Sequence, residues 1–172
     1  MKRETVQSVV LGPAWTGYQS KDALINRNGQ TFPLSSVKGQ DDFYANLEDY
    51  VRLLQGLGAK VYLIRGVPGS RPRFDPTKMV TRSVTGFRIN PDFDKPESIV
   101  EMRAIHEGVD AKLAVIADRT GAKVLDLFVD VCGSGDGCLP LFGKEEPKFT
   151  DEMHLRPIFV KGHLHFLDFL LT

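Results

Sequence analysis

The sequence predicts an α/β fold in which parallel strands alternate with helices. Three short apolar runs, at 6–15, 60–67 and 123–131, are typical of buried parallel strands, and longer segments with helical spacing separate them. Short joints between alternating strands and helices are the pattern of right-handed crossovers. With 172 residues, 42% of them hydrophobic, the chain can bury a sizeable core, and we expect one domain over 1–172.

Local patterns predict the elements of the first half of the chain. Asn28-Gly29, between the short segments 23–25 and 31–34, indicates a hairpin or turn. Apolar residues at helical spacing over 41–57 predict a helix with one buried stripe, which Gly58 ends. The stripe consists of Phe43, Leu47, Tyr50, Val51, Leu54 and Leu57. The stretch at about 68–96 is rich in Pro, Gly, Arg and Asp, and it predicts a long irregular connection.

The second half repeats the alternation. A helix is expected to open near Asp94, with Glu97 three residues later as in a capping box, and to end at Gly121. Its apolar stripe contains Met102, Ile105, Val109, Leu113 and Ile116. After the strand at 123–131, a last helix is expected over 157–171. Its inward residues are Phe159, Leu164, Leu167 and Leu171.

A carboxylate and an imidazole lie three residues apart before that last helix, at Asp151 and His154. An Asp that binds one ring nitrogen of a His fixes the tautomer and leaves the other nitrogen free to take a proton from a serine. Asp-x-x-His alone is a weak signal, but its place after three α/β units strengthens it. In parallel sheets ligands bind beyond the carboxyl ends of the strands, where we expect segments 12–18, 67–74 and 132–154.

The surroundings of this pair carry a family resemblance. A strand at 123–131 is followed by Cys132-Gly-Ser-Gly-Asp-Gly-Cys138, by Leu139-Pro-Leu-Phe-Gly143 and by Phe149-Thr-Asp-Glu-Met-His-Leu155. The chain resembles the C-terminal part of an SGNH (GDSL-type) hydrolase domain, in the version fused to acyltransferase-3 type membrane O-acyltransferases that modify bacterial surface polysaccharides. The resemblance implies a three-layer, flavodoxin-like parallel sheet. It also implies ester chemistry, with His154 as base and Asp151 as its orienter.

The family's nucleophile is absent from this chain. No Gly-Asp-Ser tripeptide occurs, and Gly135-Asp136-Gly137 lacks the serine. The resemblance therefore implies that this chain is a partial domain that lacks the first strand unit. The nucleophilic serine is then expected upstream of the chain, and the chain alone is expected to be inactive. Ser70, beyond a strand end, and Ser134, between glycines, are weaker nucleophile candidates, because glycine before serine is common in loops. The alternative function is a non-catalytic SGNH remnant that binds a glycan or a partner chain.

Other candidate residues flank the proposed site. Gly12, Trp15 and Tyr18, after the first strand, are expected to line the mouth of a cleft, with core packing as the alternative for Trp15. Gly12 is also a candidate oxyanion donor. We expect Glu152 to be a solvated neighbour of the pair. His106, His163 and His165 are expected to be packed or surface histidines.

Cys132 and Cys138 enclose a glycine-rich loop that can turn back on itself. A disulfide, two free thiols and a metal site with Asp136 are the three interpretations. The loop geometry and the extracytoplasmic location of the family favour the disulfide. No pattern in the sequence indicates a cofactor or a metal, and no Gly-x-Gly-x-x-Gly follows any strand, which argues against a NAD-type or flavin-type domain.

Composition narrows the partners. Twenty-two basic and twenty-two acidic residues balance, and Arg71-Pro72-Arg73 is the densest basic point, so nothing indicates nucleic acid. No apolar run approaches the roughly 18 residues of a membrane span, and no signal peptide begins the chain. By resemblance, we expect an extracytoplasmic location, a glycan or acyl-ester substrate, and an upstream membrane acyltransferase domain. An unpaired strand edge would favour self-association.

Overall fold

A computed structural model describes residues 6–12, 15, 23–69, 71–84, 86–143 and 146–170. The chain forms two compact units, which are described separately. The sheet unit contains Met1–Gly66 and His106–Leu125, and the loop unit contains Val67–Ile105 and Asp126–Thr172.

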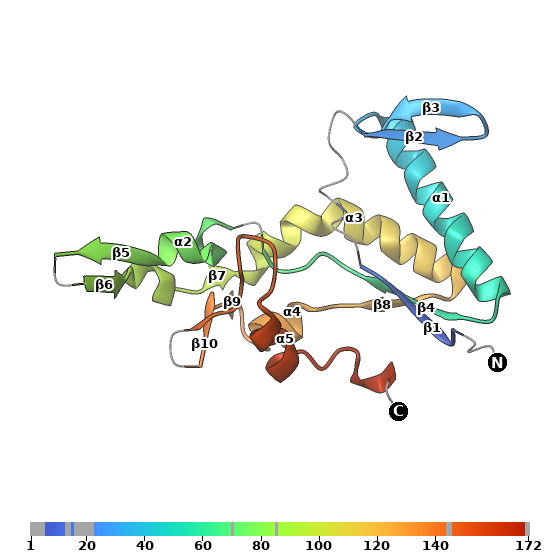
Figure 1. Cartoon of the computed structure of the whole chain (residues 1–172). Helices are drawn as coiled ribbons and strands as arrows, with labels where there is room; N and C mark the ends of the chain where they lie inside the picture. Colours follow the sequence, from blue (N-terminus) through green and yellow to red (C-terminus); the bar gives the residue numbers. More distant parts are fainter. Residues whose placement is uncertain are drawn as a thin grey trace, which may run out of the picture. The chain divides into compact units, whose positions relative to one another are not determined.

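The sheet unit is built on three parallel strands, β1 (Ser8–Leu11), β4 (Lys60–Ile64) and β8 (Lys123–Leu125), in the order β1-β4-β8 (Figure 1). Val9 pairs with Val61 in the register between β1 and β4. The register between β4 and β8 pairs Leu63 with Val124. The α/β class with a parallel sheet is therefore confirmed.

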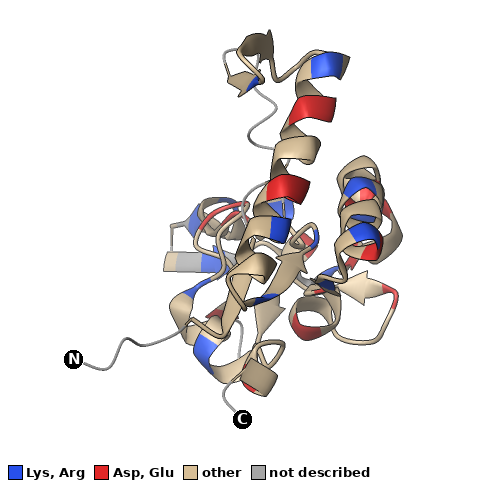
Figure 2. Ribbon diagram, turned by 90° about the vertical axis from the view of Figure 1, so that its right-hand side faces the viewer, with Lys and Arg blue, Asp and Glu red and all other residues tan. Residues whose placement is uncertain are grey.

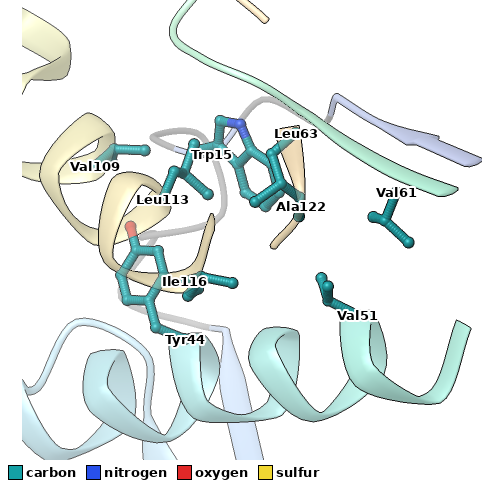
Figure 3. Packing of buried hydrophobic residues seen from close by; sticks show 9 residues of the cluster. All are labelled: Trp15, Tyr44, Val51, Val61, Leu63, Val109, Leu113, Ile116 and Ala122. Atoms are coloured by element: carbon teal, nitrogen blue, oxygen red, sulfur yellow. The ribbon is translucent and has the colours of Figure 1, made fainter. Parts of the chain in front are cut away.

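Both long helices pack on one face of this sheet. α1 (Val37–Gly56) begins four residues before the segment that the sequence predicts, because the Ser36 hydroxyl accepts the N–H of Gly39 at 3.0 Å and caps it. α3 (Ile99–Thr120) follows β4. Strands that add in one direction through right-handed crossovers place their helices on the same face. The shared core contains Trp15, Tyr44, Val51, Val61, Leu63, Val109, Leu113, Ile116 and Ala122 (Figure 3).

The predicted hairpin is present as β2 (Leu24–Arg27) and β3 (Gln30–Pro33). Both turn residues have positive φ, 53° at Asn28 and 77° at Gly29, which matches the Asn-Gly signal for a tight hairpin turn. Figure 2 shows acidic and basic residues interspersed along the ribbon. Among them, Glu48 on α1 pairs with Arg52 at 2.8 Å and with Arg119 of α3 at 3.3 Å.

The buried stripe of α3 differs from the prediction at one position. Ile105 is 44% exposed, and His106 is buried in its place between Met102 and Val109. This histidine packs so closely on Gly66 that a β-carbon there would lie 2.1 Å from the imidazole ring. Gly66 is therefore required by the approach of His106.

The loop unit consists of short elements. They are η2 (Pro72–Phe74), α2 (Pro76–Met79), β5 (Val80–Ser83), β6 (Gly86–Ile89), η3 (Pro91–Asp94), β7 (Glu97–Ser98), α4 (Phe128–Cys132), β9 (Gly137–Cys138), β10 (Leu141–Phe142), β11 (Glu146–Pro147), α5 (Pro157–His163) and η4 (Asp168–Leu170). β5 and β6 pair as an antiparallel hairpin, so the segment 68–96, expected to be irregular, contains regular structure.

Several predicted boundaries are wrong. The first two strands end at Leu11 and Ile64 instead of 15 and 67. The second helix begins at Ile99 instead of near Asp94, because Glu97 and Ser98 pair with Cys138 and Gly137 as strands β7 and β9. The third strand ends at Leu125 instead of 131, because α4 begins at Phe128, whose N–H donates to the Asp126 carboxylate at 2.9 Å. The last helix ends at His163 instead of 171. Among the described residues, no helix has both the length and the apolar character that a membrane crossing requires.

Candidate active site

Asp151 and His154 lie on a tight loop of the loop unit. Phe149 and Leu155 form an antiparallel bridge at its base, and the Thr150 N–H donates to the His154 carbonyl at 2.7 Å. Oδ1 of Asp151 accepts the backbone N–H groups of Met153 and His154, each at 2.8 Å. An Asp side chain that bonds the backbone ahead of it stabilises a turn. The sequence Asp-x-x-His therefore folds locally into a loop that returns the imidazole to the carboxylate.

The two side chains meet as predicted. Nδ1 of His154 lies 2.8 Å from Oδ2 of Asp151 and 3.0 Å from Oδ1. Because an ionised carboxylate only accepts, Nδ1 of the neutral ring carries the proton and Nε2 keeps its lone pair. The His154 side chain is 78% exposed, so the ring is accessible to a reactant.

Hydrogen bonds keep the Asp151 carboxylate ionised. The N–H of Met153, the His154 ring and the N–H of His154, in that order, lower the pKa of Asp151 to about 2 from an ordinary 3.8. Asp151 therefore carries its negative charge throughout the physiological pH range. An ionised orienter can stabilise the imidazolium that forms when the histidine takes up a proton.

Residues distant in sequence hold this loop in place. The ring of Phe149 is fully buried, and its centroid lies 4.6 Å from that of Phe74. Glu152, whose side chain is 41% exposed, accepts from the Lys78 ammonium at 2.6 Å. A β-carbon on Gly69 would lie 3.0 Å from the Glu152 carbonyl oxygen. Gly69, Phe74 and Lys78 therefore support the loop. The sequence gives no signal for the Lys78–Glu152 pair, because 74 residues separate its members.

The cysteine loop is closed by a disulfide between Cys132 and Cys138. Gly133, with φ of 81°, ends α4 and turns the chain, which glycine does without steric cost. The far side of the loop is tied to the start of α3, where the N–H of Ile99 donates to the Asp136 carbonyl at 3.0 Å. Of the three interpretations of this cysteine pair, the structure contains the disulfide. The described residues contain no cluster of three or more His, Cys, Asp or Glu side chains that could hold a metal ion.

The remaining candidates are distributed over both units. Trp15 is 4% exposed in the core of the sheet unit and donates its indole N–H to the Ile64 carbonyl at 2.7 Å, so core packing describes it. Gly12 follows β1 in the same unit, and its role as an oxyanion donor stays a prediction. Ser134 lies exposed in the disulfide loop. Tyr18 and Ser70 fall outside the described residues.

A second Asp–His contact offers a comparison. Nδ1 of His165 lies 2.9 Å from Oδ2 of Asp168. The carboxylate of this pair follows its histidine in sequence, whereas that of Asp151 precedes it. The backbone N–H groups that fix Asp151 belong to the residues between the partners and to His154 itself. His165 therefore provides a control for substitutions at His154.

Comparison with known proteins adds the family. A model of the family described as SGNH domain (fused to AT3 domains) matches residues 1–161. A search of curated proteins found no match, and neither did a search of solved structures. The matched region contains the parallel sheet, the disulfide loop and the Asp151–His154 loop. The chain belongs to the family of SGNH domains that are fused to AT3 domains.

Proposed function

We propose that this chain is the SGNH part of an esterase or O-acyltransferase, and that Asp151 and His154 are the Asp–His part of its Ser-His-Asp triad. The observation that supports the proposal is the 2.8 Å contact between Oδ2 of Asp151 and Nδ1 of His154. This contact fixes one ring nitrogen and leaves Nε2 free in an exposed side chain.

The proposed chemistry uses a serine outside residues 1–172, which the family pattern puts before them. The serine Oγ attacks the acyl carbonyl carbon, and Nε2 of His154 accepts the hydroxyl proton. The ester C–O bond then breaks, and His154 returns the proton to the leaving oxygen. In the second half, a sugar hydroxyl or water gives its proton to His154 and attacks the acyl-serine. The bond between the acyl carbon and the serine Oγ then breaks, and His154 returns the proton to Oγ, which releases the acylated sugar or the free acid and restores the serine. Asp151 stays ionised throughout and stabilises the imidazolium.

The family supports a proposal for the substrate and the setting. An AT3 domain is a membrane acyltransferase, so we propose an acetyl group as the acyl group and a cell-surface glycan as its carrier or acceptor. A membrane acyltransferase domain is the proposed partner, on the extracytoplasmic side of a bacterial membrane. The disulfide between Cys132 and Cys138 supports this location, because disulfides persist in oxidising compartments.

Acetate release tests the proposed function. The chain, joined to the Gly-Asp-Ser segment proposed to precede it, is incubated with an acetylated polysaccharide, with and without a sugar acceptor. Wild-type protein is expected to release or transfer acetyl groups, and His154→Ala and Asp151→Asn are expected to lose this activity. His165→Ala is the matched control and should retain it. Release that is equal in the wild type and in His154→Ala would favour the alternative, a glycan-binding remnant.

Self-association is a further expectation. In the described residues, β1 pairs on one side only, with β4, and its other side presents backbone N–H and C=O groups. Val10 pairs with Tyr62 and so lies on the opposite sheet face from Val9 and the core residue Val61. Val10→Lys should reduce the association measured by sedimentation at several concentrations. Monomeric wild-type chain at every concentration would contradict this expectation.

A further inference from the structure

An open pocket of about 350 Å³ lies in the loop unit, outside the Asp151–His154 pair. Its wall combines the disulfide loop with residues of α4, β10 and α5. The lining residues are Asp130, Val131, Cys132, Gly133, Gly137, Leu139, Leu141, Phe142, Lys148, Phe159 and His163. A concave, largely apolar site with a few convergent polar groups is the usual form of a small-molecule site.

The most unusual lining group is the ammonium of Lys148. Lys148 is only 8% exposed. Within the part of the chain that the structure describes, Nζ donates one hydrogen bond, to the Val131 carbonyl at 2.7 Å, and lies over the Phe159 ring, 5.6 Å from its centroid. Among the described residues, no Asp or Glu forms an ion pair with it. An ammonium has three N–H donors, so Lys148 can donate further hydrogen bonds to a ligand in the pocket. Burial lowers the pKa of Lys148 to about 8, as expected for a cation that lacks a counter-charge.

The backbone holds this lysine in place. Its N–H donates to the Pro140 carbonyl at 2.9 Å, and its carbonyl accepts the N–H of Arg156 at 2.8 Å. These two hydrogen bonds fix the backbone of Lys148 within the segment that leads to Asp151. A buried charge without an acidic partner destabilises a fold, and none of the described residues supplies Lys148 with one, so binding of an anion would relieve that cost.

Aromatic rings form the neighbouring wall. Phe159 stacks on His163 with centroids 5.1 Å apart, and the Phe142 ring meets each of them edge-on, also at 5.1 Å. The negative face of an aromatic ring attracts the partly positive C–H groups of a sugar ring. Asp130, on the same pocket, has a carboxylate that can accept hydrogen bonds from sugar hydroxyls.

We propose that this pocket binds an acidic sugar, whose carboxylate is recognised by Lys148, whose ring packs on Phe142 and His163, and whose hydroxyls bond Asp130. The pocket contains neither Asp151 nor His154, so this ligand site goes beyond the proposed acyl chemistry and stands independently of it. Its lining includes Cys132, so the disulfide loop forms part of the pocket wall.

Three small ligands test the proposal: D-glucuronate, D-glucose and acetate. Each is titrated into the ¹⁵N-labelled chain, and the amide resonances of Gly133 and Gly137 report on the pocket. We expect glucuronate to bind about tenfold more tightly than glucose, since a hydrogen bond to a charged group contributes on that order. Acetate, which lacks the ring, should bind more weakly than glucuronate. Equal affinities for glucuronate and glucose, or for glucuronate and acetate, would overturn the proposal without any variant.

Variants then assign the contacts. Lys148→Met keeps the apolar stem, removes the charge and should abolish the preference for glucuronate over glucose. Lys161→Met, at an exposed position of α5, is the control and should preserve the preference. Phe142→Ala should weaken the binding of glucuronate and of glucose by the same factor. His154→Ala should bind glucuronate as tightly as the wild type does. A failure of the proposed acyl chemistry can therefore be distinguished from a failure of this binding site. A preference that survives in Lys148→Met would sink the assignment.

Discussion

Oδ2 of Asp151 lies 2.8 Å from Nδ1 of His154, while Oδ1 of the same carboxylate accepts two backbone N–H groups of the loop that joins them. One carboxylate therefore folds the loop and orients the imidazole. This double use makes the pair more than a chance spacing of three residues, because a rotation of the carboxylate would break both sets of bonds.

The tautomer of His154 depends on this contact. Replacing Asp151 with Asn leaves a group that can donate as well as accept, so the fixed preference for a proton on Nδ1 should be lost. Long-range ¹H–¹⁵N NMR correlations of the neutral ring measure the tautomer directly. We expect the Nδ1–H form to dominate in the wild type and a mixture in Asp151→Asn, with Asp168→Asn as control. An Nε2–H form in the wild type would contradict the assignment.

Acid should release the loop only at very low pH. The pKa of Asp151 is lowered to about 2 in the fold from an ordinary 3.8, chiefly by the Met153 N–H. Its stabilising contribution is thus fully present above about pH 4 and is lost as pH falls through about 2. The carboxyl carbon shift of Asp151, assigned with Asp151→Asn and followed by NMR, should titrate near 2. A midpoint at or above 3.8 would show that the backbone bonds are absent in solution.

The base of the loop depends on Phe149. This side chain is fully buried against Phe74, so Phe149→Ala removes a large apolar group and leaves a cavity. We expect a loss of about 3–5 kcal/mol in the free energy of unfolding, measured by urea denaturation. Met153→Ala, in the same loop at a side chain that is 45% exposed, is the control and should change it little. Equal effects of the two substitutions would argue against the packing described.

The disulfide should contribute modestly to stability. A bridge between residues six apart closes a short loop, for which the chain-entropy model gives roughly 2 kcal/mol. Replacing Cys132 and Cys138 together with Ser should lower the free energy of unfolding by about that amount. Intact mass after alkylation without reductant checks the bridge itself. Two alkylated cysteines in protein made under oxidising conditions would show that the bridge does not form.

Local signals in the sequence predict the local parts of the structure well. Asn28-Gly29 predicts the hairpin because its residues alone set the turn, and Asp151-x-x-His154 predicts a contact within one loop. One boundary that failed depends on a distant partner. Glu97 pairs with Cys138 and so delays the helix, although the spacing around Asp94 resembles a capping box. Sequence spacing carries no information about such pairs.

The same limit applies to the supports of the candidate site. Lys78 and Glu152 are 74 residues apart, and no pattern joins them before the chain has folded. Lys148 looks like a surface lysine in the sequence, and its burial follows from packing against residues of α4 and α5. The contact between Asp151 and His154 could be predicted from the sequence. The distant residues that support their loop, and the pocket that contains Lys148, could not.

The hydrolysis of p-nitrophenyl acetate tests the central claim most directly. Four proteins are compared: residues 1–172 alone and joined to the proposed Gly-Asp-Ser segment, each as wild type and as His154→Ala. In the joined protein, we expect His154→Ala to lower kcat/KM by at least about 10³-fold, because a triad loses nearly all its acceleration without its base. In residues 1–172 alone, wild type and His154→Ala should hydrolyse the ester equally slowly. An unchanged rate for His154→Ala in the joined protein would contradict the role of His154, and a His154-dependent rate in the chain alone would contradict an external serine.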